Sequence, residues 1–288
     1  MSSPTLDVQA ARAPGPAAGP STASTSPPPR ASRAPRRARA WRRWLSPLAV
    51  VVLWQIAGGA GLLPERLLAA PSTVAATAAD LVTQGVLPTA IAVSLQRVAI
   101  GFAAGALAGV LLAVVAGLGR PGEYAVDPIM QMLRALPFFG LIPLFILWFG
   151  IGETPKVTLV ALAVSFPLYL NTFAGIRGVD GKLAEVAHTL RLGRAALLRH
   201  IVLPGALPQT LVGLRQSLGV AWLALIVAEQ VNADAGLGFM INDAREFLRT
   251  DVIVVGLLVY SALGLLTDAL VRLLERRALV WRRGFLAE

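Results

Sequence analysis

The chain has 288 residues, of which 56% are hydrophobic and 15% are charged, and its formal net charge is +10. A soluble domain of this length needs a larger polar fraction to cover its surface, so the composition excludes that class. The chain contains no cysteine, which excludes disulfides and thiolate metal sites.

The N-terminal residues 1–43 differ in composition from the rest of the chain. They are rich in Pro, Ala, Ser and Arg and contain few large apolar side chains. Such a segment buries too little apolar surface to offset the entropy lost on ordering. We therefore expect a disordered basic tail that lies near anionic lipid headgroups.

Six apolar runs follow, each close to the 20 residues that a helix needs to cross the hydrocarbon core of a bilayer. They predict an all-α integral membrane protein with six transmembrane helices, which form one transmembrane domain over residues 44–288. The predicted spans lie near residues 45–63, 92–118, 129–150, 157–176, 205–230 and 252–274.

Small residues and prolines mark the second, third and fourth spans. Gly101, Gly105 and Gly109 recur every fourth residue and line one helix face, where another backbone can approach closely. We favour packing inside one subunit over a subunit interface for this face. Prolines interrupt the third and fourth spans, as expected of kinked helices around a pathway: Pro137, Pro143 and Pro167.

The basic residues set the orientation of the spans. Twenty of the 26 Lys and Arg residues flank one side, four flank the other, and Arg97 and Arg215 lie within spans. Because cytoplasmic loops carry the excess of Lys and Arg, both termini are expected in the cytoplasm. The same placement argues against a nucleic-acid partner, since the basic residues flank spans and form no folded basic face.

The cytoplasmic connection 178–204 contains a charged segment between two apolar runs. Asp180 is a candidate N-cap for a helix from Gly181 to Leu192, and a second short helix is expected from Arg194 to Val202. Both helices are too short and too charged to span. The first helix carries an apolar stripe that needs a groove to bury it: Leu183, Val186, Ala187 and Leu190.

This segment resembles the EAA loop of ABC-importer permeases, which reads EAA, three residues, G, nine residues, I, one residue, LP. Val186 replaces the second Ala and Arg191 replaces the Gly, so Gly193 is expected to supply the turn and to shift the bend between the helices. In the family this loop docks on the cytoplasmic ATPase. The resemblance therefore assigns ATPase coupling to Glu185, Ala187, Leu190, Arg191, Gly193, Ile201 and Pro204.

The resemblance covers about residues 60–285 and is strongest to the nitrate/sulfonate/taurine branch. GLGFMINDAREFLRTD (236–251) is most similar to aliphatic sulfonate permeases. The resemblance implies a type I ABC-importer permease in the bacterial inner membrane, with a permease homodimer, two ATPase subunits and a periplasmic binding protein. ATP is then used by the partner ATPase, and this chain binds no cofactor and no metal. The connection 232–251 is expected to contact the binding protein.

Charged and polar residues inside the spans are the candidates for the translocation pathway, because charge in lipid is costly. Arg97 and Glu229 are expected toward the periplasmic side, where they either pair or line the pathway. Arg215 is expected near the midplane, where it either pairs with Asp268 or meets a sulfonate, which stays charged as it crosses. Five residues form this candidate set: Arg215, Gln216, Asp268, Arg97 and Glu229.

Other function classes fit the sequence less well. Residues 117–122 match GxGxxG, but they follow a membrane helix and contain a proline, so a dinucleotide site is not expected. A polytopic membrane enzyme or scaffold would need catalytic or metal-ligand groupings inside the spans, and we find none. Within the importer class the substrate alternatives are taurine, nitrate and a thiamine-precursor-like molecule.

Overall fold

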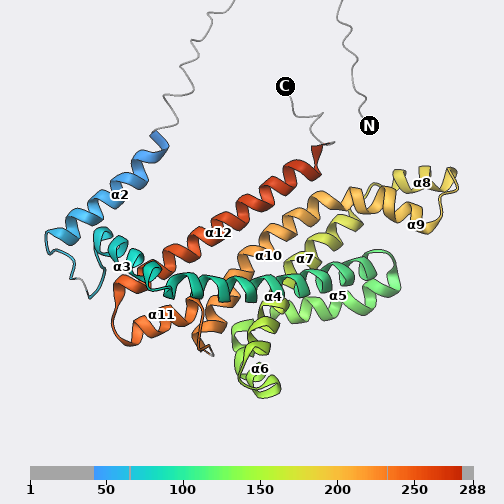
Figure 1. The fold of residues 1–288 in the computed structure, drawn as a ribbon. Coiled ribbons are helices and arrows are strands. Elements are labelled where there is room, and N and C mark those ends of the chain that lie inside the picture. The colour runs from blue at the N-terminus through green and yellow to red at the C-terminus, as the bar shows by residue number, and fades with distance from the viewer. Residues whose placement is uncertain (1–41, 65, 232, 281–288) are drawn as a thin grey trace, which may run out of the picture. The chain divides into compact units, whose positions relative to one another are not determined.

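The computed structural model describes residues 42–64, 66–231 and 233–280, and every regular element in these ranges is helical (Figure 1). Residues 1–41 of the expected tail lie outside the described residues, and its last two residues begin α2. Contacts divide the chain after Leu48, and α3 to α12 lie within the unit Ala49–Glu288. The elements are α2 (Arg42–Gly59), α3 (Pro71–Thr83), α4 (Val86–Gly117), α5 (Arg120–Ala135), η1 (Phe138–Leu141), α6 (Ile142–Phe149), α7 (Glu153–Arg177), α8 (Gly181–Thr189), α9 (Arg194–Leu197), η2 (Leu198–Val202), α10 (Leu203–Val231), α11 (Leu237–Glu246) and α12 (Thr250–Ala278).

Four of the six expected spans are single apolar helices long enough to cross a membrane. These candidates are Val86–Gly117, Glu153–Arg177, Ala195–Val231 and Thr250–Ala278. They contain the expected second, fourth, fifth and sixth spans.

The third expected span is broken. Its residues are divided between α5 and the helical segment Phe139–Phe149, which is bent from α5 by 88°. Leu136 adopts an extended conformation with ψ of 136° directly before Pro137. The proline ring disfavours the helical region for the preceding residue, which explains why α5 ends there. The proline was expected to kink this span, but it separates two helices.

The first expected span, 45–63, is shorter in the structure. The apolar helix ends at Gly59, and its apolar part Leu45–Gly59 would extend about 22 Å at 1.5 Å per residue. This is less than the roughly 30 Å of a hydrocarbon core. Glycines close the helix, and Gly61 adopts a φ of 71°.

Helix α7 is the central helix of the unit Ala49–Glu288 and packs against both α4 and α10. In the 18-residue apolar stretch of α7, 61% of the residues are buried, compared with 22% in that of α12. The glycine face of α4 makes this packing possible: a Cβ on Gly105 would lie 2.2 Å from the Ala161 carbonyl oxygen, and one on Gly109 would lie 2.6 Å from that of Ser165. The expectation that this face packs inside one subunit is confirmed.

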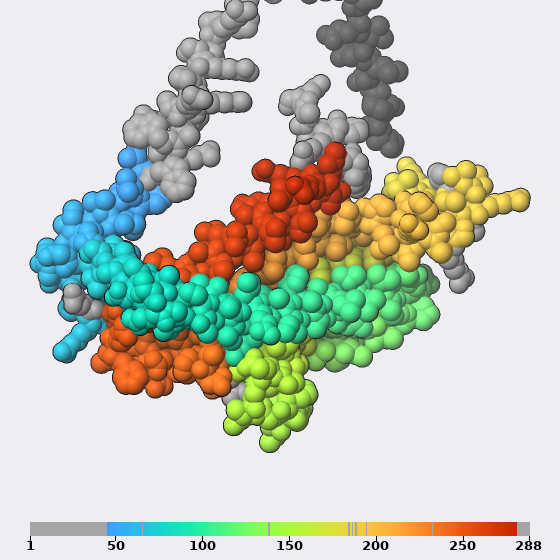
Figure 2. Space-filling model, in the orientation of Figure 1, coloured from blue at the N-terminus to red at the C-terminus, as the bar shows by residue number. Residues whose placement is uncertain are grey.

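The two ends of the long helices carry different short elements (Figure 1). Helices α8 and α9 lie between the end of α7 and the start of α10, while α11 lies between the end of α10 and the start of α12. Helix α6 packs on α7 and α10 through Ile142 and Phe145, and it stands out from the surface (Figure 2). Its side chains Leu147 and Trp148 are 79% and 62% exposed.

Candidate functional site

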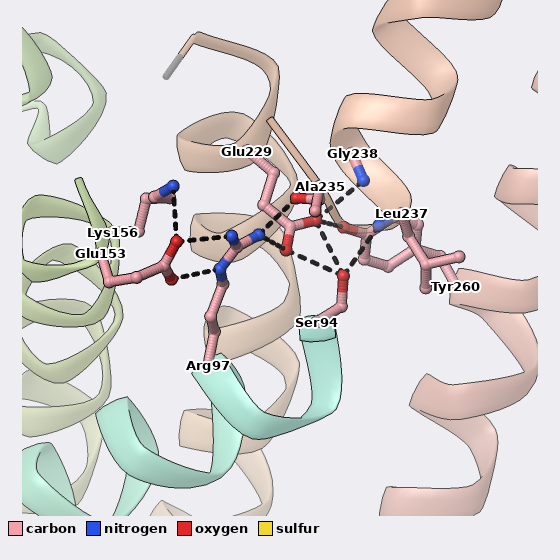
Figure 3. A network of polar contacts seen from close by, with 9 residues as sticks. All are labelled: Ser94, Arg97, Glu153, Lys156, Glu229, Ala235, Leu237, Gly238 and Tyr260. Atoms are coloured by element: carbon pink, nitrogen blue, oxygen red, sulfur yellow. Dashed lines mark hydrogen bonds and ion pairs between the residues drawn. The ribbon is translucent and has the colours of Figure 1, made fainter. Parts of the chain in front are cut away.

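Glu229 on α10 is the centre of a buried polar network (Figure 3). The residue is 1% exposed. Its carboxylate accepts hydrogen bonds from Arg97 Nη1 at 2.7 Å, Ser94 Oγ at 2.8 Å and Tyr260 Oη at 3.0 Å, and from the Gly238 N–H at 2.8 Å. The network therefore joins α4, α10, α11 and α12 at one buried carboxylate.

The chain before α11 folds over this carboxylate. Gly236 has a φ of 113°, and a Cβ there would lie 2.4 Å from Glu229 Oε1. The next N–H, that of Leu237, donates to Ser94 Oγ at 2.8 Å, and Arg97 Nη1 donates to the Ala235 carbonyl at 2.6 Å. The N-terminus of α11 thus faces Glu229, where free N–H groups and the helix dipole favour negative charge.

Arg97 also reaches the start of α7. Its Nε and Nη2 donate to the two oxygens of Glu153 at 2.5 and 2.7 Å, and Lys156 Nζ lies 2.9 Å from the same carboxylate. Lys156 is 3% exposed, whereas the Glu153 side chain is 56% exposed. The positive charges of Arg97 and Lys156 balance the negative charges of the two carboxylates, so this network is neutral. The pairing alternative for Arg97 and Glu229 is therefore realised in the structure, and a pathway role for either residue has no support here.

Sequence reasoning identified Arg97 and Glu229 but missed most of their partners. Ser94 precedes Arg97 by three residues and so shares its helix face, a signal that was available. Glu153, Lys156 and Tyr260 come from distant segments, so local patterns gave no indication of them.

A second charged network joins α10 to α12. Arg215 Nε lies 3.0 Å from Asp268 Oδ1, an ion pair without hydrogen-bond geometry, and Arg215 Nη2 donates to Glu275 Oε2 at 3.3 Å. Arg272 lies 3.0 Å from the other oxygen of Asp268. The expected Arg215–Asp268 pair is present. Glu275 and Arg272 were not expected, and with them the charges of these four residues cancel.

Gln216 faces a different neighbour from Arg215. Its Oε1 accepts a 2.9 Å hydrogen bond from Asn171 Nδ2 on α7, and Asn171 Oδ1 accepts one of 3.0 Å from Gln209 Nε2. We call Asn171, Gln209 and Gln216 the amide row. Asn171 therefore forms hydrogen bonds between the packed helices α7 and α10.

In the connection 178–204, α8 begins as expected. Asp180 Oδ1 accepts a 2.9 Å hydrogen bond from the Lys182 N–H, which is N-capping geometry. The helix ends at Thr189, three residues before the expected end at Leu192.

The turn after α8 corrects one expectation. Arg191 has a φ of 52°, and the Leu192 N–H donates to the Ala187 carbonyl at 2.9 Å, the six-to-one bond of a Schellman motif. Gly193 is not among the glycines with positive φ, so the expectation that it supplies the turn is wrong. The turn remains at the position of the motif glycine, and Arg191 adopts the left-handed conformation there.

The second helix of this segment does not end before the fifth span. Helix α9 continues through the π turn η2 into α10, and Ala195–Val231 is one candidate span. Pro204 has no N–H to donate to the His200 carbonyl, and the π turn lies directly before it. Ile201 and Pro204 are half-buried on this continuous helix.

The surface of α8 is partly apolar. Leu190 is 65% exposed and Leu183 is 48% exposed, while Ala187 is 2% exposed. Glu185 is exposed beside them. The side chain of Val186 lies outside the described residues. Leu183 on α8 and Leu190, which directly follows its end, therefore present two large apolar side chains to solvent between α7 and α10.

Long apolar helices and charged side chains paired in neutral networks define a polytopic helical membrane protein. Residues 105–280 match the family model described as the binding-protein-dependent transport system inner membrane component. The chain belongs to this family and is a permease subunit of an ABC importer.

The relatives include two permease proteins named SsuC, whose names refer to aliphatic sulfonates transport. That of Bacillus subtilis (strain 168) is 42% identical over 87% of this chain and 91% of its own length. That of Escherichia coli (strain K12) is 45% identical over 84% of this chain and 92% of its own length. The taurine transport system permease protein TauC of the same Escherichia coli strain is 39% identical over 66% of this chain and 70% of its own length. These matches confirm the resemblance to the sulfonate and taurine branch.

The fold also matches solved structures. One is the crystal structure of an amino acid ABC transporter with histidines, with a TM-score of 0.58 and 19% identity over 69% of this chain and 97% of that chain. At this identity the match concerns the fold alone.

Proposed function

We propose that this permease subunit carries aliphatic sulfonates across the bacterial inner membrane into the cytoplasm. The observation that carries the proposal is the similarity to the two SsuC proteins, at 42% and 45% identity over more than four fifths of the chain. The TauC match covers a smaller part of the chain at lower identity, which favours an alkanesulfonate over taurine.

The transport work is divided among several chains in this proposal. A cytoplasmic ATPase dimer hydrolyses ATP, a periplasmic binding protein delivers the sulfonate, and two copies of the permease enclose the pathway. The connection 178–204 docks on the ATPase through two exposed leucines, Leu183 in α8 and Leu190 directly after it. Burying these two side chains in a groove of the partner would remove apolar surface from water.

The proposed arrangement in the membrane has both termini in the cytoplasm. In it α2 and the bent pair of α5 with the segment Phe139–Phe149 complete six crossings, in addition to the four long apolar helices. The basic tail 1–43 then lies beside anionic lipid, and residues 44–288 form the permease domain.

The experiment is growth of a strain that lacks this gene. We expect it to lose growth on alkanesulfonates as the sole sulfur source and to grow normally on sulfate, and plasmid-borne wild-type protein should restore growth. Normal growth on alkanesulfonates with failure on taurine or nitrate would overturn the substrate and leave the importer class intact. Growth like the parent strain on all of these would favour the thiamine-precursor alternative, or a scaffold or enzyme role.

A further inference from the structure

We propose that the amide row of α7 and α10, with Gln216 at its end, is where the crossing anion meets this subunit inside the membrane. The inference rests on the proposed function, since it concerns the anion that the importer carries. It names neutral amide donors as the contact, in place of the guanidinium of Arg215.

The direction of the hydrogen bonds in the amide row follows from one backbone carbonyl. The side-chain atom of Asn171 assigned as Nδ2 lies 2.8 Å from the carbonyl oxygen of Pro167. A carbonyl oxygen only accepts, so the facing atom of Asn171 must be its NH2 group. The same NH2 group then donates to Gln216 at 2.9 Å, and the atom of Gln216 that faces Asn171 must be Oε1.

This assignment leaves the NH2 group of Gln216 pointing away from Asn171. Gln216 is exposed, and within the described residues its NH2 group has no protein acceptor. In the row, Gln209 donates to Asn171 and Asn171 donates to Gln216. Hydrogen bonds in such a chain polarise one another, which strengthens the last donor of the chain. The row therefore ends in a donor suited to a sulfonate oxygen.

Close packing of α7 and α10 holds the row in place (Figure 1). A Cβ on Gly213 would lie 2.8 Å from Asn171 Cβ, and one on Gly175 would lie 2.9 Å from the Ala206 carbonyl oxygen. These two glycines bring the helices together on either side of Asn171. Ser217, which follows Gln216, adds a 2.8 Å hydrogen bond to the Val164 carbonyl.

The exposed face of α10 continues beyond Gln216. Gln209 and Gln216 are seven residues apart, about 10 Å along the axis, and Gln230 is fourteen residues further on, near the same face. A Cβ on Gly219 would meet nothing within 4 Å, so the face is open one turn beyond Gln216. Exposed amides at membrane depth are tolerated beside water or protein and disfavoured against lipid.

Arg215 is poorly suited to this role because its charge is already balanced. It pairs with Asp268 and Glu275, and Arg272 pairs with Asp268. An anion must also leave after it binds, and neutral amide donors hold it less tightly than an unpaired cation would. The amide row therefore offers a free donor to the anion and still allows the anion to leave.

A charge substitution tests the donor directly. In Gln216→Glu a carboxylate oxygen still accepts from Asn171, while the outward NH2 group is replaced by a negatively charged oxygen. In proteoliposomes that contain the complete importer, we expect uptake of radiolabelled alkanesulfonate to fall at least about tenfold, with ATPase co-purification unchanged. The control Gln84→Glu, an exposed glutamine at the end of α3, should keep uptake within about twofold. Equal uptake by Gln216→Glu and Gln84→Glu would overturn the proposal.

The absence of cysteine from the natural chain permits a second test that does not depend on transport. We expect Gln216→Cys to react at least about tenfold faster than Leu265→Cys, a 67% exposed position on α12, with a methanethiosulfonate reagent that carries a sulfonate. Added alkanesulfonate should slow that reaction. An unreactive Gln216→Cys would place the row against lipid, and a disulfide-linked dimer without labelling would place it in a subunit contact. Either result overturns the proposal.

The two tests separate this inference from the proposed function. If the wild-type importer takes up no alkanesulfonate, the proposed substrate is wrong, and labelling of Gln216→Cys still decides whether the row lines a water-filled pathway. If the wild type transports alkanesulfonate and Gln216→Cys is unreactive, the substrate stands and the inference fails.

Discussion

The carboxylate of Glu229 on α10 accepts a 2.7 Å hydrogen bond from Arg97 on α4, although the two residues are 132 positions apart in the chain. Both side chains are almost fully buried, at 0% and 4% exposure. Their pairing fixes the end of α10 against α4, and it anchors the start of α11 through Gly238.

Glu229→Gln should destabilise the protein strongly. The substitution removes the charge that Arg97 faces and leaves the guanidinium balanced by Glu153 alone at its other end. Breaking a buried pair in this way costs about 3–5 kcal/mol. Thermal unfolding of the detergent-solubilised protein measures the loss. The control Glu246→Gln, exposed on α11, should change stability by less than about 0.5 kcal/mol.

Gly236→Ala should also destabilise the fold, because the new methyl group would lie 2.4 Å from Glu229 Oε1 at a backbone φ of 113°. The strain of that backbone conformation is about 1–3 kcal/mol before any clash is counted. Gly264→Ala on α12 is the matched control, since a Cβ there meets nothing within 4 Å. Equal midpoints of thermal unfolding for the two variants would contradict the placement of Gly236.

Arg191→Gly should stabilise the turn after α8. Arg191 has a φ of 52°, in the left-handed region. A residue with a Cβ is destabilised there by about 1–2 kcal/mol, and glycine is not. Slower proteolysis within the segment 178–204 would show the gain. Gly193→Ala should leave the proteolysis rate unchanged, because a Cβ there meets nothing within 4 Å. A large effect at Gly193 with none at Arg191 would restore Gly193 as the turn residue.

Leu190→Glu should reduce co-purification of the ATPase, because the carboxylate would be desolvated without a partner in the proposed interface, at a cost of about several kcal/mol. Insertion of the permease into the membrane should be normal, since Leu190 is 65% exposed. Ile151→Glu, at a position 85% exposed between α6 and α7, is the matched control. Unchanged co-purification by Leu190→Glu would mean that the surface around Leu190 does not contact the ATPase.

Reporter fusions test the proposed topology. Fusions after residues 40, 190 and 286 should report the cytoplasm, because twenty Lys and Arg residues flank that side. Fusions near residues 75, 153 and 242 should report the periplasm. A cytoplasmic signal at 242 would contradict the six-crossing arrangement.

The sequence by itself determined the features that depend on neighbouring residues. Hydropathy located α4, α7, α10 and α12, since the length of an apolar run sets whether a helix can span. The spacing of Gly101, Gly105 and Gly109 predicted a closely packed face, and Asp180 was recognised as an N-cap. Each of these follows from the period of one helix or from a cap within one turn.

The tertiary structure alone decided the features that depend on distant segments. Pro137 marked an interruption in the third span, but the 88° angle between the two helices is known only from the structure. Above all, the partners of Glu229 come from α4, α11 and α12, and those of Gln216 from α7. A hydrogen bond depends on distance and direction to within a few tenths of an ångström, and only the packing of the helices sets these between residues far apart in the chain.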